Sequence, residues 1–197
     1  AKEELHKGLI NLGINNILIP EEYGGLGLDL LFATAVSQSL GEGVATLPFL
    51  GPYILAPTAI KYGASDSQKE KLFADMSQNL INFGIGFSEY FGSRDSSGLN
   101  ISDNKLTGKT LFVLDTDFAS HVMIADNKGQ IGIVSLDSND IEMIDLTTVD
   151  KTRTYKEMHF SDTPIEILDK TKSSSFAIEM ALDAGRIIAA ADSLGAS

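Results

Sequence analysis

The sequence predicts an α+β protein: helices first, then a run of short strands, then the start of one long helix. The change in hydrophobic period along the chain carries this prediction. Hydrophobic residues recur at helical spacing up to about residue 80, at alternate positions up to about residue 170, and at helical spacing again to the end. The boundary near residue 80 therefore separates an α domain from a β domain.

The first predicted helix occupies the opening residues. Leucines and an isoleucine recur at helical spacing before Gly13, a plausible C-terminal cap; they are Leu5, Leu9, Ile10 and Leu12. The stretch "LIPEEYGGLGLDLL", residues 18–31, follows. Its glycines, Gly24, Gly25 and Gly27, predict a tight turn that needs positive φ angles or close packing.

Three more helices follow this turn. Asp29 caps a helix to about Leu40, one face of which holds Leu31, Phe32, Ala35, Val36 and Leu40. Residues 49–62 form an apolar helical stretch ended by Gly63, with Pro52 and Pro57 near its bends or first turn. Ser65 precedes Gln68 by three residues, which predicts a capping box and a helix with a buried stripe at Leu72, Phe73 and Met76.

After residue 80 the pattern is typical of strands. Short β-rich runs are separated by turn residues; they read INFGIGF, KLTGKTLFVL, SHVMIAD, QIGIVSLD, DIEMIDL, TYKEMHFSD and IEIL. Strands at this spacing predict a barrel or a sandwich. The helical period returns at about Ser173 and runs to the last residue without a glycine or proline stop.

Composition excludes several classes of function. The net charge of -12 argues against a nucleic-acid or anionic-membrane surface. The absence of cysteine excludes disulfides and thiolate metal sites, and the three histidines lie far apart. No apolar run is long enough for a membrane span and no leader opens the chain, so we expect a cytoplasmic protein. Because the chain opens on Ala1 and stops inside a helical pattern, we expect both ends to be cut.

Two local motifs have ordinary structural interpretations. Gly108-Lys109-Thr110 ends like a phosphate-binding loop, but the glycine required five residues earlier is Asp103 and a strand-like run follows. We therefore predict a turn entering a strand rather than an ATPase. Glu21 and Glu22 could serve acid–base chemistry, although exposed turn carboxylates are the simpler interpretation.

Taken together, these segments resemble the acyl-CoA dehydrogenase family. "LGINNILIPEEYGGLGLDLL" resembles the family's N-terminal signature and matches P-E-E-Y-G-G-L-G from Pro20 to Gly27 without a break. "GASDSQKEKLFADM", "LTGKTLFVLDTDFASHVMIAD", "VDKTRTYKEMHFSDTP" and "ALDAGRIIAAADSLGAS" resemble the family's later segments in the same order. The resemblance covers essentially the whole chain.

The resemblance implies a domain plan and a reaction. It implies an α-helical N-terminal domain (residues 1–80), an antiparallel β-barrel middle domain (81–170) and the first helix of a truncated C-terminal four-helix bundle (171–197). The family's reaction is α,β-dehydrogenation of an acyl-CoA thioester in fatty acid metabolism, including β-oxidation. The implied cofactor is FAD, and the implied partners are an acyl-CoA substrate, an electron-transfer flavoprotein or similar acceptor, and homo- or hetero-oligomer subunits.

The resemblance also assigns candidate FAD-binding residues. The family's T-E-P-x-A-G-S-D stretch falls on Ser88 to Asp95, where Ser88 keeps a hydroxyl for the flavin, Phe87 precedes it, Tyr90 replaces proline and Arg94 replaces serine. Phe112 falls where the family has an aromatic residue that stacks on the isoalloxazine. Leu114 falls where a threonine often bonds the flavin, and leucine cannot donate a hydrogen bond.

No catalytic residue is assigned within the chain. In most family members the base lies in the C-terminal bundle, and in a minority it directly precedes an arginine matching Arg186, where this chain has Gly185. Glu179 lies about two turns earlier and would face elsewhere.

Two hypotheses follow from the resemblance. The first is a fragment of a FAD-dependent acyl-CoA dehydrogenase, inactive by itself because the missing bundle carries the base. The second is a non-catalytic subunit of a heteromeric acyl-CoA dehydrogenase whose flavin site is degenerate. Ser88 and Phe112 are compatible with the first hypothesis, while Tyr90, Arg94 and Leu114 favour the second.

Overall fold

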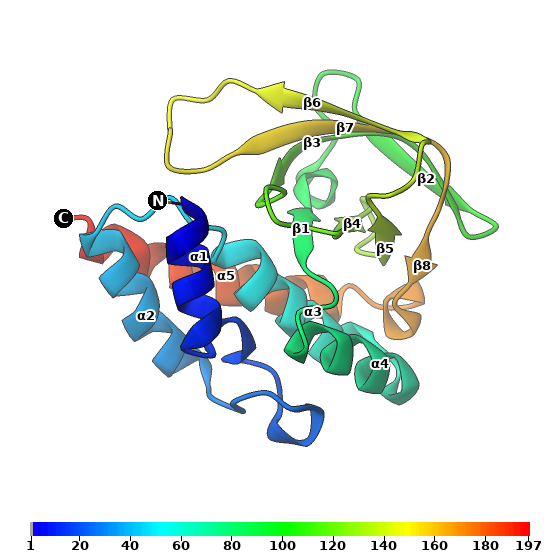
Figure 1. Cartoon of the computed structure of the whole chain (residues 1–197). Coiled ribbons are helices and arrows are strands. Elements are labelled where there is room, and N and C mark those ends of the chain that lie inside the picture. Colours follow the sequence, from blue (N-terminus) through cyan, green and yellow to red (C-terminus); the bar gives the residue numbers. More distant parts are fainter. Residues whose placement is uncertain (1) are drawn as a thin grey trace.

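The computed structural model describes residues 2–197 and places a layer of helices beneath a curved β-sheet (Figure 1). The five α-helices are α1 (Lys2–Asn11), α2 (Leu30–Glu42), α3 (Ala56–Gly63), α4 (Asp66–Ser77) and α5 (Phe176–Gly195). A π-helical turn, η3 (Gly51–Leu55), leads directly into α3. The shorter 3₁₀ turns are η1 (Ile14–Asn16), η2 (Glu21–Tyr23), η4 (Ser88–Phe91) and η5 (Asp169–Lys172).

Helix starts follow the predicted capping residues. The Asp29 carboxylate accepts a hydrogen bond from the Phe32 amide at 3.1 Å, which satisfies one free amide at the start of α2. The capping box at the start of α4 is also present, with the Ser65 amide donating to the Gln68 side chain at 3.1 Å. Both predictions are confirmed.

The structure confirms the tight glycine turn predicted before α2, including its positive φ angles and its close packing. Gly24 and Gly27 have φ angles of 85° and 61°, a region that favours glycine. Gly25 serves close packing instead, because a Cβ at this position would lie 2.0 Å from the Ile19 carbonyl oxygen. The turn therefore folds back against the apolar run that precedes it.

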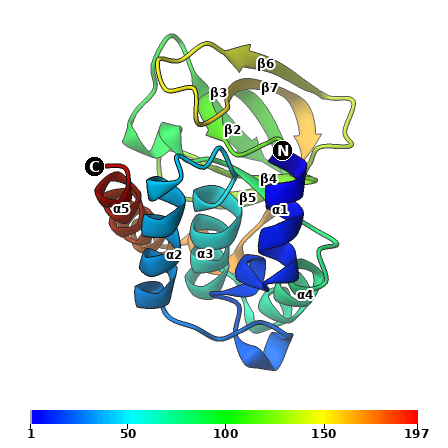
Figure 2. The ribbon, with the colours of Figure 1, turned by 60° about the vertical axis from the view of Figure 1, so that its left-hand side comes forward.

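The buried face of α2 is not the face of large hydrophobic residues that the sequence predicted. Leu31 and Phe32 are exposed, whereas the small residues Ala33, Ser37 and Gly41 are buried. These small residues face α5, which lies beside α2 and α3 (Figure 2). Close helix contact, rather than side-chain hydrophobicity, selects the buried face of α2.

The β part is one eight-stranded sheet. Its strands are β1 (Phe83–Gly86), β2 (Gly98–Ser102), β3 (Lys105–Leu114), β4 (His121–Ala125), β5 (Ile131–Ser135), β6 (Ile141–Leu146), β7 (Tyr155–Pro164) and β8 (Glu166–Ile167). The strand order is β6-β7-β3-β1-β4-β5-β8, and β2 pairs with β3.

This sheet confirms the predicted β domain but differs from an antiparallel barrel in two details. β1 and β4 are parallel, with Phe83 opposite His121. Within residues 2–197, no pairing joins β6 to β8, so the sheet curves without closing. Closure and strand direction depend on long-range pairing, which alternating hydrophobic residues do not specify.

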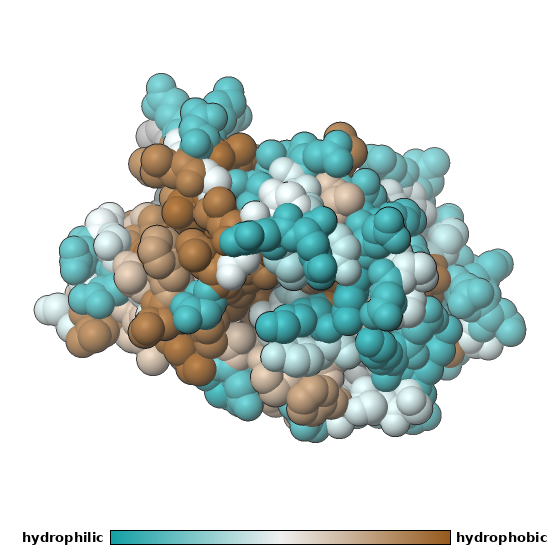
Figure 3. All heavy atoms as spheres, turned by 90° about the horizontal axis from the view of Figure 1, so that it is seen from below, coloured by the Kyte–Doolittle hydropathy of each residue, from teal (hydrophilic) through white to brown (hydrophobic). Residues whose placement is uncertain are grey.

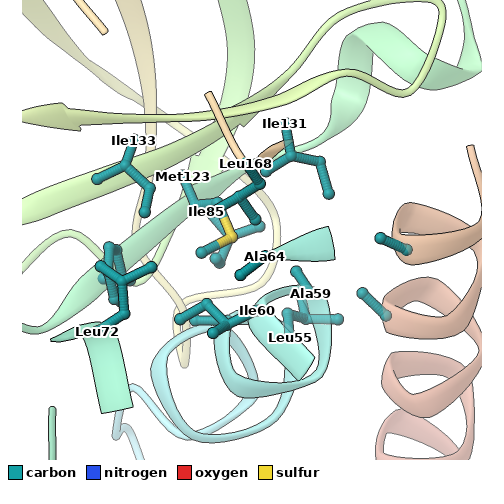
Figure 4. Close-up of a cluster of buried hydrophobic side chains, with 14 of the residues drawn as sticks. Leu55, Ala59, Ile60, Ala64, Leu72, Ile85, Met123, Ile131, Ile133 and Leu168 are labelled. Atoms are coloured by element: carbon teal, nitrogen blue, oxygen red, sulfur yellow. The ribbon is translucent and has the colours of Figure 1, made fainter. Parts of the chain in front are cut away.

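The main hydrophobic core joins the helices to the sheet. Its buried side chains come from both parts of the chain (Figure 4), and those labelled there are Leu55, Ala59, Ile60, Ala64, Leu72, Ile85, Met123, Ile131, Ile133 and Leu168. A second cluster is formed by strand residues and lies around Val113, Ile124 and Met158. A third lies among the helices around Ile17, Ile54 and Ile188.

Candidate functional site

The end of β1 brings two predicted flavin-site residues to the start of η4. Phe87 is buried in the main core, so its ring supports the strand from inside. The Ser88 hydroxyl lies 2.5 Å from the Leu111 carbonyl oxygen and 3.2 Å from the Thr110 hydroxyl. Ser88 therefore ties η4 to β3, and the bond to Leu111 uses its single donor hydrogen.

Phe112 is the aromatic face of the candidate site. It lies where the register between β3 and β7 shifts, between Thr110 and Val113, and its φ angle of 56° turns it out of the strand. Its side chain is 41% exposed, and its ring meets Tyr155 of β7 edge-on at 6.4 Å. This exposed ring could stack on a flat partner.

Leu114 lies at the end of β3, between β1 and β7. It pairs with Ile85 on one side and Tyr155 on the other, and it packs against the main core. A hydrocarbon side chain offers no hydrogen bond at this position. Ser88 is thus bonded to β3, the strand that also contains Phe112 and Leu114.

Arg94 lies apart from this group. It is exposed in the loop between η4 and β2, where its backbone amide donates to the Ser97 hydroxyl at 2.9 Å. No ion pair involving its guanidinium occurs in the part of the chain described. Nothing in the described structure draws Arg94 toward Ser88 or Phe112.

Two acidic residues of this region were not anticipated as site residues. Glu89 is 2% exposed, and its Oε2 atom has no hydrogen-bond partner. Asp115, which follows Leu114, is also buried, and burial raises the pKa of its carboxyl group to about 6. Both stand in segments used for the resemblance, but burial of a carboxylate depends on packing that the sequence does not reveal.

Asp115 links the sheet to the helical layer. Its Oδ2 atom accepts a hydrogen bond from the Gly51 amide at 2.8 Å, at the start of the π-helical turn. Tyr53 of the same turn is buried, and burial with the nearby Asp115 charge raises the pKa of its phenol to about 12. Its hydroxyl lies 2.9 Å from Nε2 of His6 in α1. The region beneath β3 is therefore a buried polar junction.

The first turn of α5 also contacts η4, the turn that contains Ser88. The Tyr90 hydroxyl donates to Glu179 Oε1 at 3.0 Å, and the Ser175 hydroxyl donates to the same oxygen at 2.7 Å. Glu179 is thus held toward η4. Further along α5, Gly185 is buried, and a Cβ there would lie 2.8 Å from Leu55 Cδ2, so a larger residue at 185 would meet the core.

An apolar groove runs beside the glycine turn. It has a volume of about 240 Å³ and lies among the start of α2, α3 and α5, with Leu28, Pro57 and Ile187 in its walls. On the face drawn in Figure 3, hydrophobic residues gather on the side where α1 and α2 lie, and hydrophilic residues cover the other side. Among the described helices, none has the length and hydropathy required to cross a membrane.

The residues present fit the flat ring of a flavin better than its polar edge. Phe112 and Tyr155 supply aromatic surface. The polar atoms of an isoalloxazine require hydrogen-bond partners when buried. At the two positions expected to supply donors, Ser88 already donates to Leu111 and Leu114 has no donor. At these two positions, the side chains therefore supply no free hydrogen-bond donor for FAD.

The N-terminal part of the chain matches a known family model. Residues 1–79 match the model described as acyl-CoA dehydrogenase, N-terminal domain. Acyl-CoA dehydrogenase FadE26 of Mycobacterium tuberculosis is 27% identical to this chain over 112 residues, covering 54% of this chain and 28% of FadE26. This alignment and the family model indicate the same family.

Solved structures share the fold over nearly the whole chain. Butyryl-CoA dehydrogenase from Megasphaera elsdenii has a TM-score of 0.80 at 20% identity, covering 98% of this chain and 57% of that one. The ChsE4–ChsE5 complex from Mycobacterium tuberculosis has a TM-score of 0.77 at 19% identity, covering 98% of this chain and 54% of that one. The chain thus spans little more than half the length of these structures and about a quarter of FadE26.

Proposed function

We propose, from the premise that the chain belongs to the acyl-CoA dehydrogenase family, that it is part of a non-catalytic subunit of a heteromeric acyl-CoA dehydrogenase. In this proposal a partner subunit binds the flavin and supplies the base. This chain supplies the helical layer and the sheet, which support the shared assembly.

The proposal rests on the side chains of Leu114 and Ser88. Leu114 has no hydrogen-bond donor, and the Ser88 hydroxyl already donates to the Leu111 carbonyl at 2.5 Å. Arg94, in the exposed loop, stands where the resemblance implies a serine. The ChsE4–ChsE5 structure, a complex that includes a chain with this fold, is consistent with assembly of unlike chains.

Phe112 favours a second candidate function. Its exposed ring stands where the resemblance implies an aromatic residue that stacks on a flavin. In this alternative the intact protein is a FAD-dependent acyl-CoA dehydrogenase that oxidises an acyl-CoA thioester and passes electrons to an electron-transfer flavoprotein or similar acceptor. The described chain would then be an inactive part of that enzyme.

Flavin content of the intact protein separates the two candidates. The first predicts that the intact protein, produced without its partner subunit, is colourless and quenches the fluorescence of added FAD only weakly. Leu114→Thr adds a hydroxyl at the critical position, and one net hydrogen bond of about 1 kcal/mol strengthens FAD binding about fivefold. Leu146→Thr is the matched control, because Leu146 pairs with the other side of Tyr155, and it leaves FAD binding unchanged.

A second measurement tests the assembly. The tagged intact protein, purified from its own cells, co-purifies with a yellow acyl-CoA dehydrogenase chain, and the pair oxidises acyl-CoA with an artificial electron acceptor. A yellow intact protein that carries stoichiometric FAD and turns over acyl-CoA alone would refute the first candidate and establish the second.

A further inference from the structure

The terminal strand β6 has an unpaired edge. Its six residues, Ile141–Leu146, pair with β7 from Ile141 opposite Phe160 to Leu146 opposite Tyr155 without a register shift. In residues 2–197, β6 is the end of the strand order and no second strand pairs with it. Figure 1 shows β6 and β7 extending together above the helical layer.

The backbone groups that face this open edge can be identified. The Ser161 amide donates to the Asp140 carbonyl at 3.0 Å, which marks 140 and 161 as a hydrogen-bonded pair. Hydrogen-bonded and non-bonded pairs alternate along antiparallel strands. The amides and carbonyls of Ile141, Met143 and Asp145 therefore point away from β7, free to pair with another strand.

This edge lacks several of the usual protections against strand addition. Natural edge strands are often blocked by proline, a bulge, charged side chains (lysine above all) or very short length. β6 contains no proline, bulge or lysine, its charged side chains are the acidic Glu142 and Asp145, and its central residues are exposed on both faces of the sheet. The exposed fractions of Met143 and Ile144 are 46% and 41%, and Val149 in the following turn is fully exposed.

The charged side chains of β6 are acidic. Glu142 and Asp145 flank Met143 and Ile144, and their side chains point to opposite faces of the sheet because they are three residues apart. Asp145 contacts Lys156 of β7, on the paired side of β6. Glu142 lies opposite His159 of β7 and forms no ion pair in the described structure.

The hairpin that carries this edge is held in place. Arg153, in the loop between β6 and β7, donates to Asp192 near the end of α5 at 3.1 Å. This contact joins the far end of the hairpin to the helical layer. The edge is therefore presented on a supported strand rather than on a free loop.

We propose that β6 is a docking edge for an extended segment of another protein, which adds a strand to the sheet. The segment carries Lys or Arg, two apolar residues, and Lys or Arg, so that its basic side chains face Glu142 and Asp145 and its apolar side chains face Met143 and Ile144. Backbone hydrogen bonds to an edge supply affinity in this mode, and the side chains supply specificity.

A designed peptide tests the proposal on the intact protein. The probe is acetyl-Thr-Lys-Val-Val-Lys-Thr-amide, and its control replaces both lysines by glutamate. We expect the lysine peptide to bind at least tenfold more tightly at low salt, and the preference to decrease as salt rises. Amide-resolved hydrogen exchange shows new protection at Ile141, Met143 and Asp145, with no change at Glu142 and Ile144.

Two variants of one residue separate backbone pairing from side-chain contact. Met143→Pro removes an outward amide without removing a bond to β7, a position at which edge strands tolerate proline, and it weakens peptide binding at least tenfold. Met143→Ala keeps the amide and weakens binding less.

Glu142→Lys shifts the preference toward the glutamate peptide, and circular dichroism checks that each variant is folded.

Three results would overturn the proposal: equal binding of the two peptides, protection outside residues 141, 143 and 145, or β6-dependent self-association of the intact protein without peptide binding. The exchange pattern in the unmodified protein decides the matter even if Met143→Pro does not fold.

Discussion

A Cβ atom at Gly41 in α2 would lie 2.1 Å from the backbone carbonyl oxygen of Asp192 in α5. The contact is mirrored at Gly195 of α5, where a Cβ would lie 2.0 Å from the carbonyl oxygen of Gln38. The Ser37 hydroxyl of α2 also donates to the Ile188 carbonyl of α5 at 3.0 Å. The two helices therefore touch backbone to backbone, with no space for a methyl group at either glycine.

Gly41→Ala is expected to destabilise the protein. The added methyl group must push α2 away from α5, and overpacking of this kind costs about 1–3 kcal/mol. Urea unfolding followed by circular dichroism should show a lower midpoint with an unchanged slope.

Gly8→Ala is the matched control for this prediction. Gly8 lies inside α1, and a Cβ there would meet nothing within 4 Å. Alanine is a better helix former, so this variant should gain about 0.5–1 kcal/mol. Equal effects of the two substitutions would show that the Gly41 contact with Asp192 does not limit helix approach.

Asp115 should make stability depend on pH with a sign opposite to that of an ordinary surface carboxylate. Burial raises the pKa of its carboxyl group to about 6 in the folded protein, above the value of about 4 in an unfolded chain. The folded state then binds more protons between these values, so this group's contribution to stability decreases as pH rises from about 4 to 6.

Asp115→Asn removes this titration while keeping an oxygen that can accept from the Gly51 amide. Relative to the unmodified protein, the variant should gain about 2 kcal/mol of stability between pH 4.5 and pH 7. Urea unfolding of both proteins at both pH values measures this difference in stability. The contributions of the other carboxylates are the same in the two proteins and cancel in the comparison. A constant difference between the two proteins would contradict a raised pKa at Asp115.

Arg153→Ala should release the turn of the β6–β7 hairpin. The side chain loses its bond to Asp192, the link between this turn and α5. Because partly exposed ion pairs contribute about 0–1 kcal/mol, global stability should change little. Hydrogen exchange of residues 148–154 should become faster, since local opening no longer requires breaking that bond.

Arg186→Ala provides the comparison for Arg153. Arg186 also pairs with an aspartate, but its partner is Asp183 on the same helix and both side chains are exposed. Its removal should leave exchange in residues 148–154 unchanged. Faster exchange there in both variants would indicate a general loss of charge rather than a lost anchor.

Local chemistry made part of the fold predictable from the sequence. Asp29 and Ser65 cap helices where they were expected to, because capping depends on residues only three positions apart. The turn at Gly24 and Gly27 depends on their own φ angles. The order of helices and strands followed from the change in hydrophobic period.

Features that depend on distant segments were less predictable. The exposure of Leu31 and Phe32 follows from the contact between α2 and α5. The outward turn of Phe112 follows from a shift in register against β7, which the sequence of β3 does not specify. At the candidate site, the resemblance supplied Ser88 and Leu114, but only the structure supplied the Leu111 carbonyl as the partner of Ser88.

The shared core has a consequence for how this chain can be divided. Ile60 and Leu72 from the helices pack in one cluster with Ile85 and Met123 from the strands. A cut at residue 80 would leave each half with a large apolar face open to water, so neither piece should remain monomeric. Heat should therefore unfold helices and strands in a single transition. A chimera that takes its β half from a relative should fold only when it also takes that relative's helical residues of the shared core.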